Sequence, residues 1–88
     1  MSGWTLFYTK EAEKDSKKLK QASLKEKVES LLRVIKRSPL QNPPPFEKLV
    51  GDLQGLNSRR ISIQHRLVYQ VLQDEQAVKV LRMWTHYQ

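Results

Sequence analysis

The chain is 88 residues long, with 39% hydrophobic and 28% charged residues and a formal net charge of +7. This length predicts one domain over residues 1–88 with a modest core, and the composition excludes a disordered or fibrous chain. Without cysteine, disulfides and thiolate metal sites are excluded. We expect no signal peptide, and the longest mainly apolar run, LVYQVL, is too short to span a membrane. We therefore expect a cytoplasmic protein with no membrane association.

The positive charge is concentrated in the first part of the chain. Residues 1–38 hold ten Lys or Arg against five Asp or Glu, a net charge of +5, whereas residues 39–88 hold six against four, a net charge of +2. Such an excess favours a polyanionic partner such as RNA, DNA or the ribosome. A pair of solvated basic helices would give the same pattern.

The first segments predict a strand followed by a helix. Residues 4–9, WTLFYT, are aromatic and β-branched, as in a strand. Thr9 is expected to cap a helix over residues 10–22, whose first turn holds Glu11 and Glu13 where negative charge is favourable.

A second helix is predicted almost without a linker. Ser23 and Glu26 have the spacing of a capping box. Pro39 disfavours helix just before itself, so the helix should end near Ser38. Its apolar residues follow helical spacing on one face: Leu24, Val28, Leu31, Leu32 and Ile35. The two helices should form an antiparallel hairpin.

The remaining residues predict a loop and three strands. Residues 41–49, QNPPPFEKL, should form a rigid extended loop, because its prolines cannot enter a helix or a central strand. Residues 50–60 are rich in turn formers, residues 60–73 alternate as a strand with a bend near His65, and residues 77–87 form the last strand after a turn. The predicted class is α+β, a small antiparallel sheet with the N-terminal helical hairpin on one face.

Several side chains suit phosphate chemistry. Arg59, Arg60 and Arg66 lie close together in the sequence, and the planar guanidinium matches phosphate oxygens. Salt bridges to nearby carboxylates are the alternative. Glu47 follows three prolines, which would hold a general base rigidly, although an exposed structural glutamate has the same signature. His86 can donate or accept a proton near neutral pH.

Together these residues suit RNA cleavage that uses side chains alone. The reaction needs a base for the 2′-hydroxyl, positive charge at the phosphorane and an acid for the leaving 5′-oxygen. We find no metal-binding or nucleotide-binding motif, and we expect no metal and no cofactor.

The run SRRISIQHRLVYQV at residues 58–71, with LQG shortly before it, resembles the core signature of YoeB/Txe-type toxins. These toxins belong to the RelE/ParE superfamily of toxin–antitoxin systems. The upstream PPFEKL and the distant His86–Tyr87 pair also fit. The signature matches at Leu53, Gly55, Ser58, Arg59, Arg60, Ile61, His65, Arg66, Leu67, Val68 and Tyr69.

The resemblance implies a role for each of these polar residues. Glu47 resembles the general base, and Arg66 resembles the arginine that binds the scissile phosphate. Apart from the resemblance, an exposed glutamate is a poor base for a hydroxyl, so we expect Glu47 to be partly buried beside Arg60 or Arg66. The resemblance also implies these further roles: His86 as general acid, Tyr87 as its neighbour in the active site, Arg60 as an RNA contact, Arg59 as an RNA contact or a structural residue, and His65 as a structural residue.

The resemblance further implies a RelE-like microbial ribonuclease fold and an mRNA interferase that cuts mRNA in the ribosomal A site. It implies a cognate antitoxin of the YefM/Phd type, and such toxins are often homodimers. Three departures bear on activity: Val50 replaces a frequent lysine, Leu56–Asn57 replaces frequent aromatic residues, and Gln88 follows the terminal tyrosine.

Two other functions fit parts of this pattern. One is a non-catalytic basic module that binds RNA or the ribosome, with a salt-sensitive affinity. The other is a ParE-like toxin that binds DNA gyrase, which would need neither Glu47 nor His86.

Overall fold

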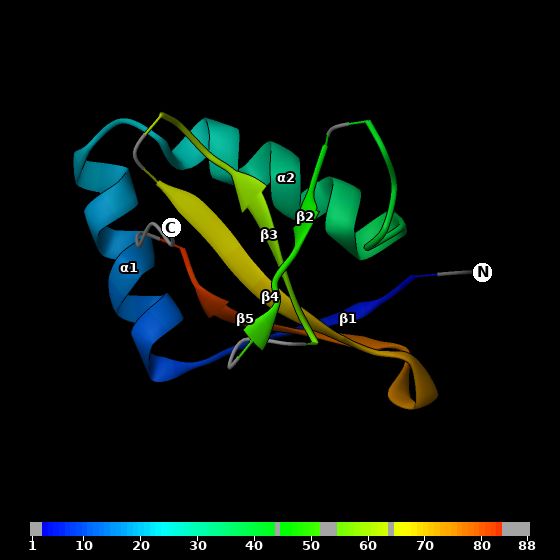
Figure 1. Cartoon of the computed structure of the whole chain (residues 1–88). Coiled ribbons are helices and arrows are strands. Elements are labelled where there is room, and N and C mark those ends of the chain that lie inside the picture. The colour runs from blue at the N-terminus through cyan, green and yellow to red at the C-terminus, as the bar shows by residue number, and fades with distance from the viewer. Residues whose placement is uncertain (1–2, 44, 52–54, 64, 84–88) are drawn as a thin grey trace.

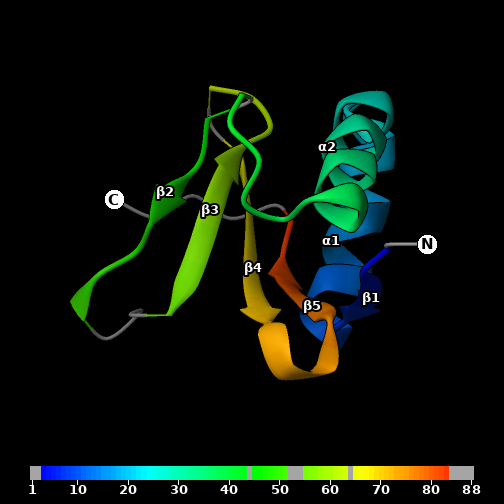
Figure 2. The ribbon, with the colours of Figure 1, turned by 90° about the vertical axis from the view of Figure 1, so that its right-hand side faces the viewer.

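The computed structural model describes residues 3–43, 45–51, 55–63 and 65–83. The α+β class is confirmed, with two helices on one face of a sheet (Figures 1 and 2). None of the helices in these ranges is long and apolar enough to cross a membrane. The elements in chain order are β1 (Thr5–Tyr8), α1 (Lys10–Gln21), α2 (Lys25–Arg37), β2 (Glu47–Lys48), β3 (Leu56–Arg60), β4 (Arg66–Leu72), the short 3-10 turn η2 (Gln73–Glu75) and β5 (Ala77–Arg82).

The sheet is mixed rather than wholly antiparallel. Its strand order is β1-β5-β4-β3-β2. The pairs β2–β3, β3–β4 and β4–β5 are antiparallel as predicted, whereas β1 runs parallel to β5. The pattern of a single strand does not reveal its neighbour, so the direction of β1 was not predictable from residues 4–9.

The predicted strand over residues 60–73 is wrong in its first part. Between β3 and β4, the backbone N–H groups of Ile61 and Ser62 both donate to the carbonyl of His65 and close a turn. The strand β3 instead occupies part of the segment predicted to be turns, starting at Leu56. The predicted bend therefore reverses the chain completely, and this hairpin brings Arg66 directly opposite Arg60.

The core lies between the helices and one face of the sheet (Figure 2). The predicted apolar face of α2 is confirmed, with Val28 and Ile35 buried. Leu24, Leu31 and Leu32 pack against the same core while remaining partly exposed. The sheet contributes these buried residues: Leu67, Tyr69, Val78 and Val80. Both helices cover one face, so in the described part of the chain the other face of the sheet carries no helix.

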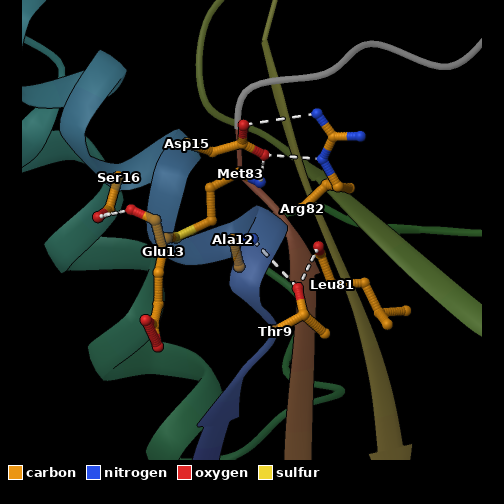
Figure 3. A network of polar contacts seen from close by, with 8 residues as sticks. All are labelled: Thr9, Ala12, Glu13, Asp15, Ser16, Leu81, Arg82 and Met83. Carbon is orange, nitrogen blue, oxygen red and sulfur yellow. Dashed lines mark hydrogen bonds and ion pairs between the residues drawn. The ribbon is translucent and has the colours of Figure 1, made fainter.

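Thr9 fixes the start of α1, as predicted. Its Oγ1 accepts the backbone N–H of Ala12 at 3.1 Å and donates to the carbonyl oxygen of Leu81 at 2.8 Å (Figure 3). One hydroxyl thus caps the helix and ties it to β5, so the helix start and the last strand are held together.

Asp15 forms a second tie between α1 and β5 (Figure 3). Its buried carboxylate accepts Arg82 Nε at 2.8 Å, Arg82 Nη2 at 3.4 Å and the backbone N–H of Met83 at 3.1 Å. Burial alone would raise the pKa of Asp15, but these hydrogen bonds and the charges of Arg82 and Lys18 outweigh burial and lower it. Asp15 therefore stays ionised beneath the end of β5.

Ser23 does not cap α2, so the predicted capping box is wrong. No side chain caps this helix, and Ser23 has a left-handed backbone with a φ of 61°. The N–H of Ser23 donates to the carbonyl of Lys20, and the N–H of Leu24 donates to that of Leu19. This pair of bonds is a Schellman motif that closes α1. Because there is almost no linker between the helices, Ser23 takes part in ending α1 and is not available to cap α2.

Ser23→Gly is expected to raise the free energy of unfolding by about 0.5–1 kcal/mol, because glycine adopts positive φ without a Cβ clash. Urea unfolding followed by circular dichroism checks this. The matched control is Ala22→Gly, since Ala22 has a φ of −89° and should only lose stability. A lower midpoint for Ser23→Gly than for the wild type would contradict the expectation.

Candidate active site

Three neighbouring strands place four polar residues on the sheet face that carries no helix. Glu47 of β2 lies opposite Ser58 of β3, and Arg60 of β3 lies opposite Arg66 of β4. Residues opposite each other share a face, and residues two apart on a strand do too. The intervening Leu67 belongs to the core beneath the helices. The four polar residues therefore point away from the helical layer.

Glu47 and Arg66 meet across β3. Arg66 Nη1 donates to Glu47 Oε1 at 3.4 Å, with the side chain of Arg66 21% exposed and that of Glu47 67% exposed. An ion pair this long and this exposed contributes under about 1 kcal/mol, so a substrate group can replace either partner. The expected proximity of the two residues is confirmed. The expected partial burial of Glu47 is wrong, because β2 is a two-residue strand at the edge of the sheet.

A hollow of about 280 Å³ opens at this ion pair. It combines one carboxylate, one hydroxyl and two guanidinium groups, one of them on the exposed Arg60. This donor set suits an anionic group that carries a reactive hydroxyl, such as a phosphodiester with its 2′-oxygen. The residues that line the hollow are Pro45, Phe46, Glu47, Ser58, Arg60 and Arg66.

Arg59 was expected to be an RNA contact or a structural residue, and its surroundings support the structural role. The residue is only 1% exposed. Its Nη2 donates to the carbonyl oxygens of Pro39 at 3.0 Å and Gln41 at 2.8 Å, and its Nε donates to the Tyr69 hydroxyl at 3.1 Å. The guanidinium also lies 5.0 Å from the centre of the Phe46 ring. A side chain buried in this way has no surface to offer RNA, and its contacts support the structural role.

Arg59 instead anchors the proline-rich loop that delivers Glu47. Tyr69 reinforces the anchor, since its hydroxyl donates to the carbonyl of Pro39 at 2.8 Å. Burial raises the pKa of Tyr69, and the neighbouring Arg59 offsets only part of that rise, so the phenol keeps its proton. The loop is thus held at Pro39 and under Phe46, directly before Glu47. This role of Tyr69 was not predictable from the sequence, because the partners of its hydroxyl are a distant backbone carbonyl and the buried Arg59.

His86 and Tyr87 lie outside the described residues, and their roles as general acid and its neighbour stay predictions. The strand that leads to them ends at Arg82, which pairs with Val68. Val68 lies two residues from Arg66 on β4. The last strand therefore leaves the sheet close to the end that holds the Glu47–Arg66 pair.

His65 lies in the turn between β3 and β4. Its carbonyl closes the turn, and its backbone N–H donates to Ser62 Oγ at 3.2 Å. These backbone bonds support the expected structural role at the chain reversal before Arg66.

The departures from the family pattern at Val50, Leu56 and Asn57 gather in one place. All three line a second hollow, of about 570 Å³, which also includes Lys48 of β2. Val50 is 81% exposed. None of these three residues lines the Glu47–Arg66 hollow, so the departures alter a separate part of the surface. The third departure, Gln88, lies outside the described residues.

Comparison with known proteins agrees with this architecture. The family model for the YoeB-like toxin of bacterial type II toxin–antitoxin systems matches residues 8–87 of this chain. The toxin YoeB of Mycobacterium bovis is 39% identical over 61 residues, which cover 69% of this chain and 69% of that protein. The toxin YoeB of Escherichia coli is 36% identical over 56 residues, which cover 64% and 67% of the two chains.

Solved structures show the same fold. A YoeB/ParE toxin from Agrobacterium tumefaciens superposes with a TM-score of 0.85 at 34% identity, covering 94% of this chain and 99% of that one. The YoeB–YefM complex from Staphylococcus aureus matches with a TM-score of 0.79 at 33% identity, covering 96% and 98%.

The fold and the matched residues define a small bacterial toxin of a toxin–antitoxin system. The chain belongs to the YoeB-like toxin family of bacterial type II toxin–antitoxin systems. Toxins of this family are endoribonucleases, so membership of the family supports the general assignment of this chain as a nuclease.

Proposed function

We propose that this chain is a ribosome-dependent mRNA interferase, whose active site is the hollow at the Glu47–Arg66 ion pair. The observation that carries the proposal is the contact between these two side chains on the helix-free face. A carboxylate beside a guanidinium provides a proton acceptor next to a phosphate-binding group. Neither side chain is needed for the core, which lies on the other face.

The proposed reaction moves two protons and exchanges one P–O bond for another. Glu47 takes the proton of the 2′-hydroxyl as its oxygen attacks phosphorus. Arg66 and Arg60 stabilise the charge on the non-bridging oxygens as it develops. His86 gives a proton to the leaving 5′-oxygen, with Tyr87 beside it. The products are a 2′,3′-cyclic phosphate and a 5′-hydroxyl. Each proton-transfer partner contributes about 10²–10⁴-fold in rate, and none of these steps requires a metal ion.

The basic helices are proposed to dock on ribosomal RNA. Residues 1–38 carry a net charge of +5, and the lysines of α1 and the start of α2 are exposed: Lys10, Lys14, Lys17, Lys18, Lys20, Lys25 and Lys27. The ribosomal A site would then position the mRNA against the opposite face of the sheet. Because the ribosome would position the mRNA, the open hollow would not need to bind RNA tightly by itself. This activity requires a cytoplasmic protein.

An antitoxin and a second copy of the chain are the proposed protein partners. A YoeB–YefM complex and a YoeB dimer have both been solved for the Staphylococcus aureus protein, each with 33% identity to this chain. By analogy, we propose that a YefM-type antitoxin neutralises this toxin and that the toxin forms homodimers.

The test compares mRNA-programmed ribosomes with the same mRNA free in solution. The proposal predicts cuts within the A-site codon on ribosomes only, with 2′,3′-cyclic phosphate ends. A mock purification controls for contaminating nucleases. Folded protein that binds ribosomes but cuts neither sample would overturn the proposal and favour a non-catalytic basic module.

A further inference from the structure

Ser58 carries a buried hydroxyl that has no hydrogen-bond partner among the described residues. The residue is 1% exposed. In the described part of the chain, Ser58 Oγ is the one buried side-chain polar atom without a hydrogen-bond partner. Buried hydroxyls are nearly always paired, because leaving one unpaired costs free energy. An unpaired hydroxyl in a native fold therefore calls for an explanation.

The position of Ser58 within the sheet provides that explanation. It lies on β3, between β2 and β4, with Glu47 opposite on one side and Val68 opposite on the other. The ion pair from Glu47 to Arg66 spans β3 on this same face. Ser58 also lines the hollow at that ion pair. The hydroxyl thus lies at the centre of the polar cluster, with an apolar residue as its other neighbour.

The ion pair itself is weak enough to open. Its 3.4 Å separation and the 67% exposure of Glu47 give it little stability. A phosphate group offers Arg66 a better bidentate partner than one distant carboxylate oxygen. Because Ser58 and Arg66 line the same hollow, a phosphate held there by Arg66 would bring an anionic oxygen close to the Ser58 hydroxyl.

We propose that Ser58 Oγ donates a hydrogen bond to a non-bridging oxygen of the scissile phosphate, alongside Arg66. This inference rests on the proposed nuclease function and adds a further catalytic residue to it. The bond strengthens as negative charge builds on that oxygen, so it acts mainly on the rate constant rather than on binding. The fold keeps the hydroxyl unpaired so that the substrate can pair with it.

The first experiment compares Ser58→Ala with the wild type on programmed ribosomes at saturating concentration. The single-turnover rate constant should fall about 10–100-fold, toward the range seen when one neutral oxyanion donor is removed. The urea midpoint of Ser58→Ala should equal or exceed that of the wild type, because the variant removes an unpaired buried hydroxyl. The control is Ser16→Ala on α1, whose exposed hydroxyl bonds only within its own helix.

A second readout separates a direct contact from a structural one. Sulfur is substituted for each non-bridging oxygen of the scissile phosphate in turn, giving two diastereomers. One diastereomer should slow the wild type strongly, and most of that slowing should disappear in Ser58→Ala. A structural role would leave both proteins equally sensitive to sulfur.

The two failures are distinguishable. Absence of cleavage by folded wild type would overturn the proposed function and this inference with it. Cleavage by the wild type and equal cleavage by Ser58→Ala, or an unchanged sulfur effect, would overturn only the role of Ser58.

Discussion

Arg66→Ala is expected to lower the single-turnover rate constant of mRNA cleavage on ribosomes by about 10³-fold. Arg66 is the guanidinium that contacts Glu47, and its side chain is only 21% exposed, so its charge acts in a partly desolvated hollow. The charge on the phosphorane grows in the transition state, so the loss should appear in the rate constant and little in ribosome binding. Quenched-flow cleavage at saturating ribosomes measures it.

Two variants control this result. Arg66→Lys keeps the positive charge but lacks the planar fork, so it should retain part of the activity. Arg33→Ala removes the same side chain from an exposed position on α2 and should leave the rate constant unchanged. A rate constant for Arg66→Ala within about threefold of the wild type, a loss below 1 kcal/mol, would remove Arg66 from the mechanism.

Asp15→Ala is expected to lower the free energy of unfolding by about 3 kcal/mol, as for other broken ion pairs with a buried member. In the wild type, the Asp15 carboxylate joins α1 to the end of β5 by accepting hydrogen bonds from Arg82 and from the buried amide of Met83. The variant removes this shared acceptor. Urea unfolding followed by circular dichroism measures the change. Glu13→Ala, an exposed carboxylate in the same helix, is the matched control and should change stability little.

The same ion pair predicts a dependence of stability on pH. The pKa of Asp15 is lowered in the folded protein, so its contribution is fully present above its unfolded value, about 4. That contribution should be lost as the pH falls from about 4 through the lowered folded pKa. Asp15→Asn cannot titrate and should show a shallower loss of stability over this window. Parallel curves for the two proteins below pH 4 would contradict the assignment.

The helices were predictable because their signals are local. Thr9 caps α1 and the apolar stripe of α2 faces the core, as their spacing indicated. The capping box failed because Ser23 is shared between the end of one helix and the start of the next. The parallel pairing of β1 with β5 joins the two ends of the fold, and no local pattern encodes it. A two-residue strand such as β2 is too short to show a period.

For the candidate site, the closeness of Glu47, Arg60 and Arg66 was predictable from the sequence, whereas the burial of the side chains was less so. Arg59 and Arg60 are neighbours on a strand and must face opposite sides, so only one can share a face with Arg66. This alternation could have shown that one arginine points into the core. The sequence could not show that backbone carbonyls of the proline loop would satisfy it. Nor could it show that Glu47 stays exposed.

In the proposed reaction the 2′-hydroxyl attacks phosphorus, so a message that lacks this one hydroxyl should resist cleavage. Ribosomes are programmed with an mRNA that carries a single 2′-deoxyribonucleotide on the 5′ side of the cleaved bond, and cleavage is followed in a single turnover. We expect no cut at that bond, and normal cutting of the all-ribose message. Cleavage of the deoxy-substituted bond at an unchanged rate would contradict it.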